Sequence, residues 1–290
     1  MSWRNVIISR RCKLDYKMGY LVIRSDDIKR VFLDEVNMIL LENPAVSLTG
    51  CLVEALTEKK IKVIFCDGKH DPISELVPYH GSHDCSLKIK EQMQWTPESK
   101  AAVWQQVITE KIRRQMMFLK ELKKERERDL LAEYMTQVEP GDITNREGHA
   151  AKVYFNALFG MQFTRGADLP VNAALNYGYS ILLSSFNREI TAGGYLTQIG
   201  IFHDNRFNHF NLSCDLMEPF RFLVDRAVYE MMPQQFEREE KHKLWTLFSQ
   251  TVVIRNQKQT VLNAIRIYTK CILDCIGSNT PEAICFLENE

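Results

Sequence analysis

The sequence predicts an α+β protein with a small β-rich N-terminal domain and a larger all-helical C-terminal domain. Residues 1–75 contain short β-branched runs separated by turn residues, whereas residues 86–290 carry apolar side chains spaced by threes and fours over long stretches. Residues 76–85 are expected to be a linker. A length of 290 residues, 45% of them hydrophobic and 26% charged, suits two packed domains.

The first 75 residues are expected to form five strands and one helix. Turn chemistry at Lys17-Met18-Gly19, Asn43-Pro44 and Asp67-Gly68 separates the apolar runs. The helix is predicted at 50–59, because Thr49 stands before it and apolar residues 52, 53 and 56 share one helical face. The strands are predicted from β-branched and aliphatic runs at residues 6–9, 20–24, 31–33, 38–41 and 61–66.

The stretch 70–84 contains prolines, a glycine and three histidines, which is typical of a connection between domains. His70, His80 and His83 could form a metal cluster. We favour linker or surface histidines, because no pattern of carboxylates accompanies them.

The remainder of the chain is predicted to be helical almost throughout. Thr96-Pro97 separates the first two of these helices. The charges between residues 120 and 129 alternate in sign, which favours a solvated helix face over a nucleic-acid arm. The helices are expected at residues 86–95, 98–129, 147–159, 170–193, 213–232, 234–249 and 258–276.

Charge and cysteine content restrict the class of protein. Lys plus Arg and Asp plus Glu both number 37, so the net charge is zero and the protein as a whole does not attract a polyanion such as nucleic acid. A chain with zero net charge can still carry a local stripe of basic residues. The eight cysteines contain no CxxC pair, and no apolar run approaches the roughly 20 residues of a membrane span. We therefore expect a cytoplasmic protein with reduced thiols. Cys271 and Cys275, four apart on a predicted helix, are interpreted as core thiols in preference to metal ligands.

Glu147, His203 and Glu218 are the candidate chemical residues. Two carboxylates and one imidazole can hold a divalent cation and leave coordination positions open for a phosphate and a nucleophile. Each has a structural alternative. Thr144-Asn-Arg-Glu147 matches a capping box, which taken alone favours a capping role for Glu147 over a metal ligand. A lone histidine after Gly200-Ile-Phe is more often a core residue.

The segment 212–226 supports a buried site. Asp215, Glu218 and Arg221 follow one another at intervals of three, so on a helix they share one face. The alternative is an exposed row of ion pairs, but the flanking apolar residues make the segment too apolar for that, and buried acids need partners such as a cation. Pro219 predicts that Glu218 lies near a helix start or a kink.

Aromatic and amide side chains stand on the two preceding predicted helices. Phe155 and Tyr179 are interpreted as core aromatics. Asn172, Asn176 and Tyr177 are different, because asparagine is a poor helix former and two of them four apart could position phosphates.

Three blocks in order carry a family resemblance. They are E147-G-H-A-A-K-V-Y-F155, then Pro170 leading into V171-N-A-A-L-N-Y-G-Y179, and G200-I-F-H203 continuing through D215-L-M-E-P-F-R221 to Asp225. With these blocks the helical half resembles the CRISPR-associated spacer integrases. The residues N-H-F-N before the last block are most similar to the integrases of type II CRISPR systems. The sequence departs from the family at Lys152, where an arginine is frequent, and at Phe222, where a proline is frequent.

The resemblance implies a function. It implies that Glu147, His203 and Glu218 are catalytic and hold Mg²⁺ or Mn²⁺, with Asp215 as a further acid. It implies a homodimer, with dimerisation expected through the β-rich domain, that joins a small second adaptation protein and other CRISPR proteins of the same locus. The expected reaction is transesterification, in which the 3′-hydroxyl of a captured double-stranded DNA attacks a phosphodiester of the CRISPR repeat.

DNA contacts are expected from basic residues close in sequence to the proposed ligands, namely Arg146, Lys152, Arg221 and Arg226, and from the amide of Asn176. Two other functions compete with the integrase. One is a metal-dependent repair nuclease that directs water at the phosphodiester. The other is a non-catalytic scaffold of the adaptation complex, in which Glu147 is a helix cap and the acids form ion pairs.

Overall fold

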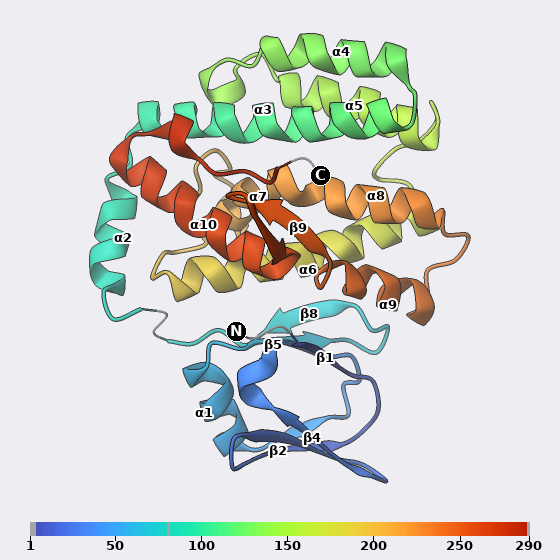
Figure 1. Cartoon of the computed structure of the whole chain (residues 1–290), viewed down its shortest axis with the longest axis vertical. Helices are drawn as coiled ribbons and strands as arrows, with labels where there is room; N and C mark the ends of the chain where they lie inside the picture. Colours follow the sequence, from blue (N-terminus) through green and yellow to red (C-terminus); the bar gives the residue numbers. More distant parts are fainter. Residues whose placement is uncertain (1–3, 80–81, 289–290) are drawn as a thin grey trace. The chain divides into compact units, whose positions relative to one another are not determined.

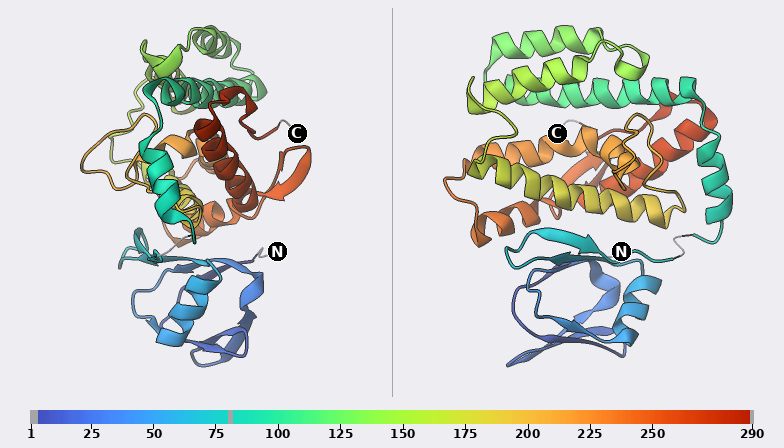
Figure 2. Two further views of the ribbon diagram at one scale, coloured as in Figure 1. Left: turned by 90° about the vertical axis from the view of Figure 1, so that its left-hand side faces the viewer. Right: turned by 180° about the vertical axis from the view of Figure 1, so that it is seen from behind.

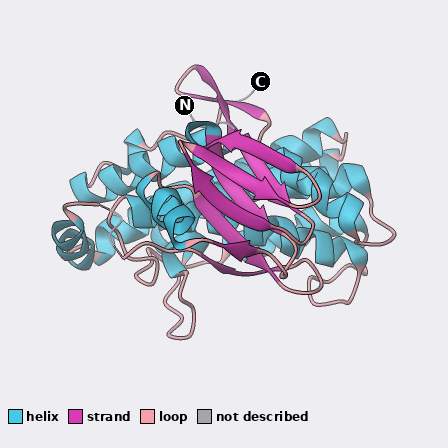
Figure 3. Ribbon diagram, turned by 90° about the horizontal axis from the view of Figure 1, so that it is seen from below, coloured by secondary structure: helices cyan, strands magenta, loops and turns pink. Residues whose placement is uncertain are grey.

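A computed structural model describes residues 4–79 and 82–288, and the chain divides into two compact units, Met1–Gly81 and Ser82–Glu290. The first unit holds strands β1 to β8 and helix α1, and the second holds helices α2 to α10 (Figure 1). The strands are concentrated in the first unit (Figure 3, magenta). The predicted α+β class is confirmed. In the part of the chain described, no helix is long and apolar enough to cross a membrane.

One sheet of the first unit has a parallel centre. Its strands run in the order β1 (Arg4–Ile8), β5 (Val36–Leu41), β7 (Lys62–Cys66) and β8 (Pro72–Glu75); the first three are parallel and β8 is antiparallel to β7. All six residues of β5 are buried, as expected of a parallel strand covered on both faces. Strand β8 lies within the stretch predicted to be a connection, so that prediction was wrong for residues 72–75.

The second sheet has the order β4 (Ile28–Phe32), β3 (Tyr20–Arg24), β2 (Lys13–Lys17) and β6 (Ser47–Leu48). Strand β2 was not predicted, because it is mostly polar and only Leu14 is fully buried. A turn at Met18-Gly19 joins β2 to β3, and its positive φ angles of 50° and 85° match the twist that a two-residue hairpin requires.

A helix and a short 3₁₀ turn complete the first unit. The 3₁₀ turn Leu33–Glu35 leads into β5. Helix α1 (Gly50–Glu58) begins as predicted, with the Thr49 hydroxyl accepting a hydrogen bond from the Leu52 N–H. Its buried Leu52 and Leu56 belong to a core that also contains Leu14 and Ile39.

Three helices of the second unit lie side by side. Helix α2 (Cys85–Met93) precedes the 25-residue helix α3 (Pro97–Glu121), and α4 (Glu125–Thr136) and α5 (Arg146–Phe159) run along α3 (Figure 2). Thr96 caps α3 by accepting a hydrogen bond from the Ser99 N–H, and Pro97 stands at its first position. The long helix α3 therefore provides a fixed support for the elements packed against it.

The predicted single helix over 98–129 was wrong, because the chain reverses between α3 and α4. Lys123 has φ +57°, its N–H bonds to the Lys120 carbonyl, and the Lys124 N–H bonds to the Leu119 carbonyl. This is the Schellman arrangement that usually carries glycine at the left-handed position. A lysine there gives no sequence signal for the helix end.

The remaining helices are α6 (Pro170–Ala192), α7 (Asn211–Met217), α8 (Arg221–Met231), α9 (Arg238–Leu247) and α10 (Val261–Ser278), followed by the 3₁₀ turn Pro281–Ala283. The segment predicted as one helix over 213–232 is interrupted by the 3₁₀ turn Glu218–Phe220. The prediction that Glu218 lies near a helix start or kink is confirmed.

The second unit is not all-helical, which corrects the prediction. Strands β9 (Thr251–Ile254) and β10 (Gln257–Thr260) form an antiparallel hairpin, so the helix predicted from residue 258 begins at Val261. Arg255 and Asn256 make its turn with φ angles of 52° and 57°. The β-branched run 251–254 before Arg-Asn was a signal for this hairpin.

Candidate active site

The three residues predicted as metal ligands lie around one cavity of about 270 Å³ in the second unit. Glu147 comes from the first turn of α5, His203 from the loop between α6 and α7, and Glu218 from the 3₁₀ turn between α7 and α8. The structure thus brings together residues far apart in sequence. The other side chains that line the cavity are Lys111, Gln115, Phe155, Arg165, Tyr179, Arg221 and Asp225.

Lys111 of α3 connects the two carboxylates. Its Nζ lies 2.5 Å from Glu147 Oε1 and 2.6 Å from Glu218 Oε2. The sequence prediction missed this residue. A signal existed, because Lys111 stands three and four residues after Ile108 and Val107 and is therefore a cation on the apolar face of its helix.

Glu147 is free of the capping role that its local sequence favoured. The N-cap of α5 is Asn145, whose side chain accepts a hydrogen bond from the Gly148 N–H, and the Asp142 carboxylate accepts from the N–H groups of Arg146 and Glu147. The predicted capping box over 144–147 was therefore wrong. Asp142 and Asn145 serve the helix terminus, and the Glu147 side chain pairs with Lys111 instead.

Asp215 holds His203 in place. Its Oδ2 accepts hydrogen bonds from the N–H groups of Ile201 (2.6 Å) and Phe202 (3.0 Å), and its Oδ1 accepts from the His203 N–H (3.1 Å) and contacts His203 Nδ1 at 2.5 Å. Asp215 is fully buried. Because Nδ1 is engaged, Nε2 is the ring nitrogen left for a ligand, and the predicted accessory acid is a positioning residue.

The loop that carries His203 also rests on α3. Trp104 stacks on Phe202, with ring centroids 4.5 Å apart, and meets the His203 ring edge-on at 5.8 Å. Gly200 is required by this packing, because a Cβ there would lie 2.3 Å from the His203 carbonyl oxygen and 2.8 Å from Asp215 Oδ2. The imidazole is thus fixed by its backbone, its aromatic neighbours and Asp215 together.

Arg221 and Tyr179 border the other side of Glu218. Arg221 Nε donates to Glu218 Oε1 at 2.9 Å, and its guanidinium lies over the Tyr179 ring. The Tyr179 hydroxyl donates to the buried Asp225 carboxylate. Tyr179 is buried, as expected of a core aromatic, but it also lines the cavity.

Arg165 is a second cation that the sequence prediction missed. It donates to Asn172 Oδ1 at 2.6 Å and to Asn176 Oδ1 at 2.7 Å, and it lies over the rings of Phe155 and Tyr179. The two asparagines, singled out for their spacing on α6, therefore hold an arginine at the cavity.

Of the residues predicted to bind DNA, only Arg221 lines this cavity. Arg146 lies over the Tyr134 ring, and Arg226 pairs with Glu121 and lies over Phe118. Lys152 and Asn176 are exposed. DNA contact by any of the five stays a prediction.

Burial and ion pairing set the charges in the cavity. Burial raises the pKa of Glu218, but Arg221 and Lys111 outweigh burial and hold that pKa below its ordinary value. Burial likewise lowers the pKa of Lys111, but Glu218 and Glu147 outweigh it, so the pKa is raised. The hydrogen bond to Asp215 raises the pKa of His203, and burial raises that of Asp225 to about 6. At neutral pH Glu218 is ionised and Lys111 is protonated.

The cavity contains the types of ligand atom that a divalent metal ion prefers. Glu147, Glu218 and the imidazole of His203 supply the oxygen and nitrogen atoms that suit Mn²⁺ or Mg²⁺. Glu218 Oε2 is buried without an aligned hydrogen bond, although Lys111 Nζ lies 2.6 Å from it. Within residues 4–79 and 82–288, however, no three His, Cys, Asp or Glu side chains are arranged to hold a metal as they stand. Lys111 lies between the two carboxylates.

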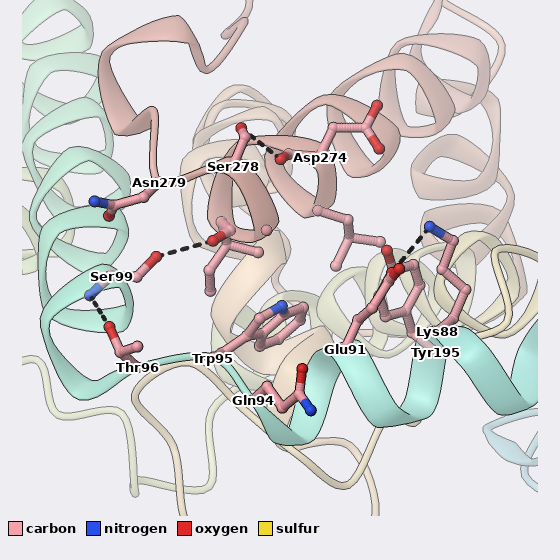
Figure 4. A pocket seen from close by; sticks show the side chains of 13 residues that line it. Lys88, Glu91, Gln94, Trp95, Thr96, Ser99, Tyr195, Asp274, Ser278 and Asn279 are labelled. Atoms are coloured by element: carbon pink, nitrogen blue, oxygen red, sulfur yellow. Dashed lines mark hydrogen bonds and ion pairs between the residues drawn. The ribbon is translucent and has the colours of Figure 1, made fainter.

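A larger cavity of about 580 Å³ lies between α2, α3 and the end of α10 (Figure 4). Its polar groups pair with one another: Lys88 with Glu91, and the Ser99 hydroxyl with the Ile276 carbonyl. Neither a histidine nor a pair of carboxylates bridged by a cation lines it. We therefore place the candidate active site in the smaller cavity.

The other metal interpretations of the sequence concerned the cluster of His70, His80 and His83, and the pair Cys271 and Cys275. The histidine cluster as a whole stays untested, because His80 lies outside the described residues. His70 Nδ1 lies 2.9 Å from the Glu42 carbonyl oxygen. Cys271 is buried, and its sulfur accepts a hydrogen bond from the Cys285 N–H. Neither His70 nor the Cys271 thiol belongs to a metal-binding group among the residues described.

Residues 6–245 match the family described as CRISPR associated protein Cas1. The chain is 32% identical over 268 residues to the CRISPR-associated endonuclease Cas1 of Neisseria meningitidis serogroup C, covering 90% of this chain and 88% of that protein. The CRISPR-associated endonuclease Cas1 1 of Francisella tularensis subsp. novicida is 27% identical over 243 residues, which cover 76% of this chain and 76% of that protein.

Two solved structures share the fold. A Cas1 protein from Thermotoga maritima superposes with a TM-score of 0.75 over 94% of this chain and 97% of that one. A casposase bound to integration product superposes with a TM-score of 0.76 over 96% and 91%. Both are 18% identical to this chain, so they establish the fold alone.

Proposed function

Since the chain belongs to the family of CRISPR-associated protein Cas1, we propose that it is the integrase of CRISPR adaptation. It joins the 3′-hydroxyl ends of a short foreign DNA duplex to the CRISPR repeat by transesterification. The attacking 3′-hydroxyl loses its proton and its oxygen bonds to the attacked phosphorus. The bond from that phosphorus to the repeat strand's own 3′-oxygen breaks, and the released oxygen takes up a proton.

One observation carries this proposal: Glu147, His203 and Glu218 line the same cavity as Lys111, Arg165 and Arg221. The two carboxylates and His203 Nε2 would hold Mg²⁺ or Mn²⁺. When bound, the metal supplies charge for the pentacovalent phosphate and lowers the pKa of the attacking hydroxyl.

The chain's own residues orient the reacting groups. Arg165 and Arg221 place guanidinium groups at the cavity, where they can bind phosphate oxygens of the DNA in a bidentate manner. Both arginines lie over the Tyr179 ring, and Asp215 fixes the imidazole. The groups that meet the phosphodiester are therefore held before DNA arrives.

The proposed assembly is a homodimer with a small second adaptation protein and double-stranded DNA. Solved structures titled as a Cas6-RT-Cas1–Cas2 complex share the fold of this chain, with a TM-score of 0.73 for one of them. That likeness supports the expectation of a Cas2-like partner. Dimerisation through the β-rich unit is part of the proposal.

The test is an integration assay with purified protein, its small partner, a duplex with free 3′ ends, and a plasmid that carries the repeat. Integrated or branched product supports the proposal. If the only product is nicked plasmid, the protein acts as a nuclease, an activity that the name endonuclease of its relatives favours. Integration by a folded Glu147→Ala, His203→Ala, Glu218→Ala triple variant would support a scaffold.

A matched pair of histidine variants sharpens the assay. His203→Ala removes a side chain of the cavity, whereas His209→Ala removes an exposed histidine from the same loop. We expect loss of integration in the first variant and wild-type yield in the second. Equal activity of the two variants would contradict the assignment of His203.

A further inference from the structure

Lys111 occupies the position between the two carboxylates that the proposed metal ion would share. It is 9% exposed, and its Nζ lies within 2.6 Å of an oxygen of Glu147 and an oxygen of Glu218. A metal ion held by both carboxylates would use Glu218 Oε2, because Arg221 already donates to Oε1, and Oε2 is the oxygen that Lys111 contacts. Two cations cannot share that oxygen at such a distance without strong mutual repulsion.

The contact with Glu218 has the character of an ion pair. Glu218 Oε2 has no aligned hydrogen bond, although the ammonium group is 2.6 Å away, whereas Oε1 receives a directed hydrogen bond from Arg221. At Glu218 Oε2 the ammonium group therefore supplies charge and no directed hydrogen bond, and the one hydrogen bond that its displacement breaks is the bond from Lys111 to Glu147 Oε1.

The carboxylates need some cation. Glu218 is 3% exposed, and an ionised carboxylate at that depth is stable only when its charge is compensated. Arg221 compensates Glu218 but is not paired with Glu147 in the described contacts. Lys111 is the group that contacts both acids.

We propose that Lys111 is an internal counter-ion, which holds Glu147 and Glu218 together in the metal-free protein and must be displaced when the divalent ion binds. This inference rests on the metal site of the proposed function. The displaced ammonium group moves into the cavity that it already lines. The arrangement sets the metal affinity below what the same ligands would give without the lysine, and it makes Lys111 a positioning residue.

The principal experiment is calorimetric titration of the full chain with MnCl₂ for the wild type, Lys111→Met and Lys62→Met. Lys62 is a matched control, because it is a buried lysine that forms an ion pair with Glu75 in the first unit. We expect Lys111→Met to bind Mn²⁺ at least about tenfold more tightly than the wild type, as ion-pair energies above 1.4 kcal/mol imply. Lys62→Met should bind with wild-type affinity.

A second measurement uses the wild type and does not depend on a variant that folds. Lysine acetylation by an amine-reactive ester is followed by mass spectrometry with and without Mn²⁺. We expect Lys111 to react faster when Mn²⁺ is present, because its amine is released from the carboxylates. The reaction of Lys62 should be unchanged.

The outcomes separate the two proposals. Equal or weaker Mn²⁺ binding by a folded Lys111→Met variant, or Mn²⁺ binding by the wild type that leaves Lys111 acetylation unchanged, would overturn the counter-ion role and leave the metal site intact. Absence of Mn²⁺ binding in both the wild type and Lys111→Met would overturn the metal site itself, and this inference with it. Binding by Lys111→Met alone would support the counter-ion role.

Discussion

Replacement of Asp215 by asparagine tests how the site holds His203. Asp215 is fully buried and accepts hydrogen bonds through both oxygens, from the N–H groups of Ile201, Phe202 and His203 and from the His203 ring. Asparagine has the same shape but one acceptor oxygen. In one orientation its NH₂ group faces the N–H groups of Ile201 and Phe202, and in the other it faces the His203 N–H, while His203 Nδ1 can change tautomer and accept from it.

The structure allows an estimate of the cost. At least one hydrogen bond to a charged acceptor is lost in either orientation, and such a bond contributes about 1.5 to 3 kcal/mol, so we expect Asp215→Asn to lower the free energy of unfolding by at least ~1.5 kcal/mol. That is a measurable part of the ~5 to 15 kcal/mol by which a protein is stable. The pKa of His203, raised above 6.5 by Asp215, should fall back toward that value.

The sign of the pH effect follows from the raised pKa. Stability from a raised histidine pKa is fully present below the unfolded value of 6.5 and is lost as pH rises through the folded value. The difference between wild type and Asp215→Asn should therefore be larger at pH 6 than at pH 9.

The assay is urea unfolding followed by tryptophan fluorescence. Trp104 reports on the loop that carries His203, because it stacks on Phe202. The His203 titration is followed by NMR. Asp204→Asn is the matched control, since it changes an exposed acid next to His203 and should leave stability within ~0.5 kcal/mol. A cost below ~1 kcal/mol for Asp215→Asn, or an unchanged His203 pKa, would refute the reasoning.

Three other variants test the surrounding structure. Asp225→Asn should be more stable than the wild type by up to ~3 kcal/mol at pH 7.5, because burial raises the Asp225 pKa from 3.8 to about 6. The advantage should shrink as pH falls through 6 and vanish below the unfolded value of 3.8, where the wild-type carboxyl is protonated in both states. Gly178→Ala should cost ~1 to 3 kcal/mol in urea unfolding, since the new Cβ would lie 2.4 Å from Val224 Cγ1, whereas Gly277→Ala in α10 has no atom within 4 Å and should gain up to ~1 kcal/mol. Asp142→Ala should cost ~1 to 2 kcal/mol, because two N–H groups at the start of α5 lose their acceptor.

Each of these variants has an outcome that contradicts its basis. A stability advantage of Asp225→Asn that does not change with pH would show that proton binding is not its cause. Equal unfolding midpoints for Gly178→Ala and Gly277→Ala would exclude the close approach of α6 and α8. If Asp142→Ala lowers the free energy of unfolding in urea but leaves the thermal unfolding of the second unit unchanged, the lost stability does not come from the start of α5.

Helix starts and central strands were predicted correctly, because the residues that mark them are close together in the sequence. Thr49 and Thr96 mark helix starts that the structure has, and continuous apolar runs mark the central strands. The failures also have physical reasons. Strand β8 is held by backbone bonds to β7, and the left-handed turn after α3 uses Lys123 in place of glycine. The capping box at Glu147 was wrong because Asn145 and Asp142 satisfy that helix start.

The sequence by itself determined the class of fold, the family, and the candidate triad of Glu147, His203 and Glu218, because a helical period and three ordered blocks are properties of the chain. Only the tertiary structure decided what surrounds that triad. Lys111 and Arg165 reach the cavity from segments that carry no motif of their own, and Asp215 turned from an accessory acid into the support of His203. Charge compensation in a buried site depends on distance in space, and residues 36 positions apart, such as Lys111 and Glu147, meet only once the helices have packed.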